Sequence, residues 1–98
     1  MDLDAFAAIV DQRRSAWEQL GIKVEFRGPP TWSAVALVNC EGEKKVAELV
    51  VWKGGRAVLE TARLDSTDDP SVHIFRIVSE IGLRGCLDDL TKYVLTED

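Results

Sequence analysis

One histidine, His73, and two cysteines, Cys40 and Cys86, are the residues of this sequence best suited to nucleophilic or metal chemistry. A hydrolytic centre needs a nucleophile, a base and a group that orients the base. No serine or cysteine lies in a nucleophile motif such as G-x-S-x-G, and the three residues are too far apart in the chain to form a recognisable metal motif. We therefore expect His73 to be an ordinary strand residue, both thiols to be reduced, and the protein to have neither catalytic activity nor a cofactor.

Two other segments could bind an ion or a phosphate. Asp65 and Asp69 fall at the first and fifth positions of a possible calcium-binding loop. Such a loop needs a glycine at its sixth position and a glutamate at its twelfth, but this sequence has Pro70 and Arg76 there. Gly54 and Gly55 are not part of a phosphate-binding pattern, and a hairpin turn accounts for both. We therefore predict no metal site, and we expect residues 65–69 to form a polar turn that is either solvated or in contact with a partner.

The elements that must position these residues follow from the spacing of the apolar side chains. Residues 4–20 and 83–95 carry apolar residues at helical spacing, and each segment predicts an amphipathic helix. Trp17 lies on the apolar stripe of the first helix, so we expect it in the core. The segments between the helices that read as β-strands are residues 22–27, 31–40, 46–52, 56–64 and 71–78. The valine- and alanine-rich strand 31–40 is expected to be central and buried on both faces.

The order of helix, five strands and helix predicts the α+β class. Gly28-Pro29-Pro30 is expected to end the first strand, because proline has no N–H for strand pairing. Short turns between successive strands favour an antiparallel meander of about five strands, and one face of that sheet can bury both the N- and C-terminal helices. The expected fold of residues 1–98 is a single domain, a two-layer sandwich whose other sheet face is open to solvent or to a partner.

The clearest feature of the sequence is a β-hairpin whose strands flank Lys53-Gly54-Gly55. Register matters here, because a shift of one residue exchanges the two faces of a strand. A three-residue loop, which pairs Trp52 with Arg56, gives one wholly apolar face formed by Ala47, Leu49, Val51, Ala57 and Leu59. The opposite face then carries Glu48, Val50, Trp52, Arg56, Val58 and Glu60. In the alternative register, Trp52 would lie beneath a helix.

In the favoured register, the second face has the composition of a protein-binding surface. Tryptophan and arginine are enriched in interface hot spots, and an apolar centre with a charged rim is typical of such surfaces. We therefore predict a partner-binding site formed by Trp52, Glu48, Arg56 and Glu60 on the sheet, and by Asp65, Asp68 and Asp69 in the acidic turn.

Composition and charge narrow the class of partner. With 46% hydrophobic and 30% charged residues, the chain has the make-up of a globular domain. The net charge of −5 disfavours a nucleic-acid partner, because phosphates attract lysine and arginine, and it suits either solubility alone or a basic protein partner. No apolar stretch approaches the roughly 20 residues of a membrane-spanning helix. The acidic first residues are unlike the basic start of a secretory signal, so we expect a cytoplasmic protein.

The hairpin in residues 50–60, with the pattern V-W-x-x-G-x-x-x-L-E, resembles that of the bacterial TriTu-type immunity proteins. The resemblance covers most of the chain, since a helix and two strands precede the hairpin. An acidic turn, a strand with His73 and a closing helix with Leu87, Leu90 and Tyr93 follow it.

The resemblance implies a cytoplasmic protein that protects a bacterium from its own polymorphic toxin. The toxins concerned are ADP-ribosyltransferase domains, often at the C-terminus of secreted Rhs-type effectors. The immunity protein would bind its cognate toxin domain, one to one, and occlude the cleft that holds NAD or the target. The residues alone leave two other functions open: a dimeric secretion chaperone that holds an unfolded effector segment, and a small ligand-binding domain with a concave pocket.

Overall fold

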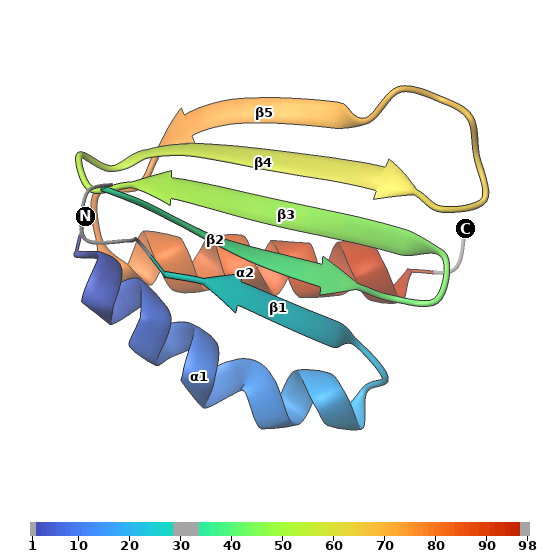
Figure 1. Ribbon diagram of the computed structural model, residues 1–98, viewed down its shortest axis with the longest axis horizontal. Helices are drawn as coiled ribbons and strands as arrows, with labels where there is room; N and C mark the ends of the chain where they lie inside the picture. The colour runs from blue at the N-terminus through green and yellow to red at the C-terminus, as the bar shows by residue number, and fades with distance from the viewer. Residues whose placement is uncertain (1, 29–33, 97–98) are drawn as a thin grey trace.

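The computed structural model describes residues 2–28 and 34–96. These residues form seven elements in the predicted order: α1 (Leu3–Gln19), β1 (Lys23–Arg27), β2 (Val35–Glu41), β3 (Lys45–Trp52), β4 (Arg56–Arg63), β5 (Ser71–Arg76) and α2 (Glu80–Leu95). The strands form one antiparallel sheet in which each strand pairs with its neighbour in the chain (Figure 1). The predicted α+β meander is therefore confirmed. The predicted turn at Pro29-Pro30 and the predicted strand start at Thr31 lie outside the described residues.

Helix α1 begins and ends where the sequence supplies capping residues. The Asp2 side chain accepts a hydrogen bond from the Asp4 backbone N–H at 2.9 Å, which satisfies one of the amides left free at the start of a helix. Gly21, with a φ of +80°, takes the left-handed conformation that commonly follows a helix end. Trp17 is only 2% exposed, and its Nε1 donates to Thr91 Oγ1 at 2.7 Å. The prediction that Trp17 is a core residue is confirmed.

Helix α2 begins three residues before its predicted start, because Ser79 caps it. The Ser79 Oγ accepts a hydrogen bond from the Gly82 backbone N–H at 3.1 Å. A salt bridge of 2.6 Å between Arg13 and Asp88 joins α1 to α2. The residues that α2 buries are Leu83, Leu87, Leu90 and Val94. In the described part of the chain, neither helix is long and apolar enough to span a membrane.

Both helices pack against the same face of the sheet, which gives the expected two layers. Helix α1 contacts β1 and β2, and α2 contacts β2 and β3 (Figure 1). Strand β5 forms the sheet edge farther from α1, and only Phe75 among its residues is partly buried. The buried apolar side chains of the sheet form one layer beneath the helices: Ala36, Val38, Cys40, Ala47, Leu49, Val51 and Ala57.

The prediction that the second strand is buried on both faces is wrong. Ala36, Val38 and Cys40 of β2 are buried beneath the helices, whereas Val35 and Leu37 on the other face are half-buried. An apolar strand indicates two covered faces only when other elements lie on both sides of the sheet, and here both helices lie on one side. The apolar side chains on the second face of β2 are therefore left facing outward.

The β3–β4 hairpin has the three-residue loop that the sequence favours. The pair next to the loop is Val51 with Ala57, as the favoured register requires. Gly55 in the loop has a φ of +97°, a conformation that residues with a side chain rarely adopt. Its N–H donates to the Trp52 carbonyl at 2.8 Å, and its own carbonyl accepts from the Ile77 N–H at 2.7 Å. Gly55 therefore closes the hairpin and also ties the end of β5 to it.

We predict that Gly55→Ala destabilises the fold and that Gly54→Ala does not. A Cβ at position 55 would lie 2.7 Å from the Ile77 backbone oxygen. The positive φ at this position is also unfavourable for a residue with a side chain. We expect Gly55→Ala to lower the free energy of unfolding by about 1–3 kcal/mol. A Cβ at position 54 would meet no atom within 4 Å, so Gly54→Ala should change the free energy of unfolding by less than about 0.5 kcal/mol. Urea denaturation measures both values, and equal stabilities would contradict this role of Gly55.

Candidate functional site

The face of the sheet opposite the helices, which we call the open face, carries its side chains in rows that run across the strands. The strand registers define three of these rows. The row nearest the β3–β4 hairpin contains Val35, Trp52, Arg56 and Arg76. The next, which we call the apolar row, consists of Leu37, Val50, Val58 and Ile74. The third row contains Asn39, Glu48, Glu60 and Val72.

The open face exposes hydrophobic side chains where a solvated sheet face normally carries polar ones. Ile74 is 65% exposed, Val72 is 54% exposed and Trp52 is 37% exposed. Val50 and Val58, in the strands between them, are half-buried. Exposed apolar side chains that gather on one face of a protein often mark a site of interaction.

Two pairs of like charges lie on either side of the apolar row. Arg56 lies opposite Arg76 on β4 and β5, and we call these two residues the arginine pair. Glu48 lies opposite Glu60 on β3 and β4, and these form the glutamate pair. Like charges directly opposite each other in a sheet are destabilising. Within residues 2–28 and 34–96, no salt bridge neutralises any of the four, so these charges are available to a partner.

Trp52 and the arginine pair are held in defined positions at the hairpin end of the open face. The Arg56 guanidinium lies over the Trp52 ring, 5.7 Å from the ring centroid. Arg76 Nη1 donates to the Gly54 carbonyl at 2.9 Å, which anchors the second arginine to the loop. Because these side chains are already ordered, less conformational entropy is lost when a partner binds them.

The open face brings together four of the seven predicted contact residues: Glu48, Trp52, Arg56 and Glu60. Sequence reasoning missed the parts of this surface that β2 and β5 supply. Leu37 and Ile74 complete the apolar row, and Arg76 completes the arginine pair. Val72 and Ile74 are two positions apart in a predicted strand, which could have indicated that they share a face. Only the pairing of β5 with β4 shows which residues of the neighbouring strands lie beside Val72 and Ile74.

The other three predicted contact residues lie elsewhere. Asp65, Asp68 and Asp69 belong to the loop between β4 and β5, at the end of the sheet opposite the β3–β4 hairpin (Figure 1). Asp65 accepts a hydrogen bond from Arg63 Nε at 3.1 Å, and this bond lowers the pKa of its carboxyl group. Asp68 and Asp69 line a small hollow together with Tyr93 of α2, so they lie toward the helix side. The loop and the open face therefore do not form one continuous surface.

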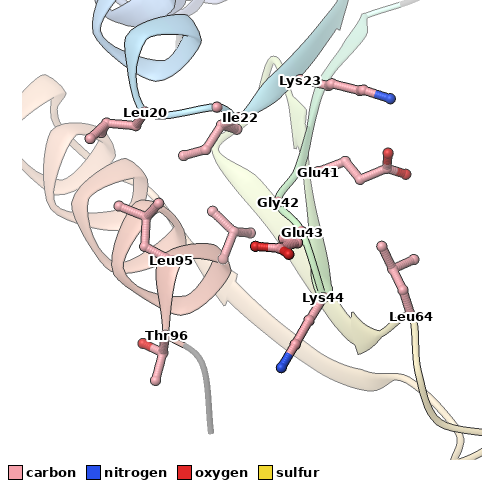
Figure 2. Close-up of a pocket in the computed structure, with 12 residues that line it drawn as sticks. Leu20, Ile22, Lys23, Glu41, Gly42, Glu43, Lys44, Leu64, Leu95 and Thr96 are labelled. Atoms are coloured by element: carbon pink, nitrogen blue, oxygen red, sulfur yellow. The ribbon is translucent and has the colours of Figure 1, made fainter.

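A hollow of about 550 Å³ lies where the turn after α1, the β2–β3 turn and the end of α2 meet (Figure 2). Leu20, Ile22 and Leu95 give it an apolar part. Its charged lining residues are of both signs: Lys23, Glu41, Glu43 and Lys44. Among the described residues, no buried side-chain polar atom lacks a hydrogen-bond partner, and no three potential metal ligands gather.

The cysteines and the histidine have the properties of structural residues. Cys40 and Cys86 are free thiols, as predicted. Burial raises the pKa of Cys40 to about 12, and burial together with the nearby Asp89 raises the pKa of Cys86. His73 is exposed on β5, which confirms that it is a strand residue. Because the thiolate is the reactive form of cysteine, both thiols are weak nucleophiles at neutral pH.

The open face gathers apolar and charged side chains of the types that form protein contacts. An apolar centre between charged groups of opposite sign can recognise a complementary protein surface. Comparison with family models, with curated proteins and with solved structures gives no match to this chain. Its function is therefore inferred from this surface and from the resemblance in the hairpin.

We predict that Cys40 resists alkylation in the folded protein. Its raised pKa keeps the thiolate fraction at pH 8 far below that of a free cysteine, and its side chain is fully buried. Cys86 is partly exposed and should react slowly but measurably. Mass spectrometry after treatment with iodoacetamide separates the two sites, and denaturant should make both react rapidly. Fast labelling of Cys40 without denaturant would contradict its buried position.

Proposed function

We propose that this chain is an immunity protein that binds a cognate toxin domain through its open face and blocks the toxin's cleft. The observation that carries the proposal is the partly exposed apolar row beside Trp52, on the sheet face opposite the one against which both helices pack. Such a row is unfavourable in water, and a protein partner would remove it from solvent at about 25 cal/mol for each Å² buried. The strands that carry the row give the partner a rigid surface.

Trp52 supports this proposal as an aromatic anchor beside the apolar row. Tryptophan and arginine dominate the binding energy of many interfaces, and the stacked Arg56 and Trp52 side chains combine both. The glutamate pair adds negative charge at the other side of the apolar row. A toxin surface that binds here would therefore place apolar groups at its centre and a basic group near Glu48 and Glu60.

The proposed toxin class, an ADP-ribosyltransferase domain, comes from the sequence resemblance. A cleft that holds a dinucleotide must attract negative charge, and the chain has a net charge of −5. Electrostatic steering of an acidic inhibitor toward such a cleft would raise the association rate and would weaken with added salt. The chain needs no reactive side chain of its own for this role, because inhibition follows from occupying the cleft.

We predict that the protein, purified from its native cell at high salt, retains a folded toxin domain in a one-to-one complex. Intact-complex mass spectrometry gives both the identity of the partner and the stoichiometry. Recovery of an unfolded effector segment would instead support a secretion chaperone. Recovery of the chain alone, from cells that contain an active ADP-ribosyltransferase toxin, would contradict the proposal.

We predict that Trp52→Ala weakens binding to that toxin domain by about 2 kcal/mol, or roughly 30-fold, because an aromatic anchor of the contact is lost. The matched control is Ile81→Ala on α2, which removes another exposed hydrophobic side chain, 83% exposed, away from the open face. Isothermal titration calorimetry gives both affinities, and growth of cells that express the toxin reports protection. Full protection by a folded Trp52→Ala variant would remove Trp52 from the site.

A further inference from the structure

The outer edge of β5 is uncovered in the described structure. Strand β5 is the last strand of the sheet and pairs with β4 alone (Figure 1). Every residue of Ser71–Arg76 is exposed except Phe75, which is half-buried. The strand contains no lysine or proline, residues that commonly prevent an edge strand from pairing with another chain. The opposite edge is protected, because α1 contacts β1 and β1 exposes the charged residues Lys23, Glu25 and Arg27.

The backbone groups that β5 presents at this edge follow from the alternation of an antiparallel ladder, in which every second residue bonds to the same neighbouring strand. The Ile77 N–H donates to the Gly55 carbonyl at 2.7 Å, in step with the register of β4 and β5. The odd-numbered residues of β5 therefore bond to β4. The backbone N–H and C=O groups of Val72, Ile74 and Arg76 point outward, and the side chains of these three residues lie on the open face.

A second copy of the chain can pair with all three outward residues in one register. Two identical edges pair in antiparallel orientation about a two-fold axis perpendicular to the sheet. When this axis passes between Ile74 of the two copies, Val72 of each copy lies opposite Arg76 of the other. Each outward N–H and C=O group of the three residues then has a backbone partner among the same three. Every other register leaves at least one of them without such a partner.

The same register joins the rows of the open face across the contact. The apolar row of one copy meets the apolar row of the other at Ile74 and continues through both sheets. The row that holds the arginine pair continues through Val72 of the second copy into the glutamate pair of that copy. The Cα atoms of Arg76 and of Glu60 in the second copy would lie about 10 Å apart, two strand spacings, which is within the range of attraction at moderate salt.

We propose that the free protein is a homodimer in which the β5 strands of two copies pair antiparallel about Ile74 and form one continuous sheet. A strand of another protein could satisfy the outward backbone groups. A second copy also continues the apolar row and places a negative row beside each arginine pair, and this charge complementarity selects it as the occupant. On the helix side, His73 of each copy lies opposite Phe75 of the other and covers its exposed part.

The other symmetric pairing of the two edges lacks these advantages. A two-fold axis parallel to the strands would place the open face of one copy beside the helix side of the other. The apolar row would then end at the contact, and the arginine pair of one copy would lie on the opposite side of the joint sheet from the glutamate pair of the other. The perpendicular axis is therefore the arrangement that the rows of the open face favour.

The proposed dimer goes beyond the proposed function and does not rest on it. The edge contact leaves the open face of each copy uncovered, so a dimer could bind two toxin domains and keep the one-to-one ratio. The measurements below use the purified chain alone. A monomeric chain would leave the proposed toxin complex standing, and failure to find a toxin would leave the dimer standing.

Two substitutions at Val72 separate this contact from effects within one chain. Val72 lies next to Glu60 of its own chain, and in the dimer it also lies opposite Arg76 of the other copy. Val72→Glu should lower the dissociation constant of the dimer about 10-fold, although it adds a like charge beside Glu60. Val72→Arg should raise this constant about 10-fold, although it adds an opposite charge beside Glu60. Sedimentation equilibrium measures the unmodified chain and both variants.

A substitution at Ile74 tests the backbone contact. Ile74→Pro removes an N–H that points outward, so the ladder between β4 and β5 keeps its hydrogen bonds. We expect it to raise the dissociation constant at least about 10-fold more than Ile74→Ala, which keeps the N–H. Circular dichroism confirms that the variants are folded. A monomeric unmodified chain, Val72 variants that shift in the same direction, or equal dimerisation of the two Ile74 variants would overturn the proposed dimer.

Disulfide formation tests the register without changing any charged residue. His73 of one copy and Phe75 of the other form a non-hydrogen-bonded pair, whose Cα atoms lie about 4.5 Å apart, within reach of a disulfide. Mild oxidation of an equimolar mixture of His73→Cys and Phe75→Cys should give a mixed disulfide, which mass spectrometry identifies. The control mixture of His73→Cys and Ile81→Cys, whose new thiol lies on α2, should give only the background of the unmodified chain. Equal yields from the two mixtures would overturn this register.

Discussion

The register of the β3–β4 hairpin is the constraint on which the rest of the structure depends. Gly55 fixes it, because only a glycine readily takes the positive φ of the loop and leaves room for the Ile77 backbone. A shift of one residue would move Leu49 and Val51 out of the core and place Glu48 and Trp52 beneath the helices. The same glycine holds β5 through its carbonyl group, so it also determines which residues of β5 join the open face.

The order of elements and the core residue Trp17 could be predicted from the sequence, because they depend on periodicity within single segments. The hairpin register could be predicted because one of its two alternatives gave a uniformly apolar face. Burial of β2 on both faces could not be judged, since a strand's composition does not say where helices dock. The separation of the acidic loop from Trp52 was missed although the predicted meander implies it, because the turns before and after β4 lie at opposite ends of that strand.

The open face combines features that lower the stability of a single chain. Exposed apolar side chains gain nothing in water, and two like-charge pairs across neighbouring strands repel each other. A sheet optimised for stability alone would carry alternating opposite charges at these positions. The unfavourable placement is explained if these side chains make their favourable contacts with another protein surface, as in the proposed toxin complex.

The meander topology has a consequence for how the chain folds. Each strand pairs with the strand that follows it, so the sheet can form by successive closure of short loops, without bringing distant segments together first. The contacts between distant parts of the sequence lie mainly in the helical layer, where Trp17 meets Thr91 and Arg13 meets Asp88. Short separations between paired strands favour rapid formation of the sheet. The open face, which the sheet alone carries, can therefore form before the helices from the two ends of the chain close over the other side.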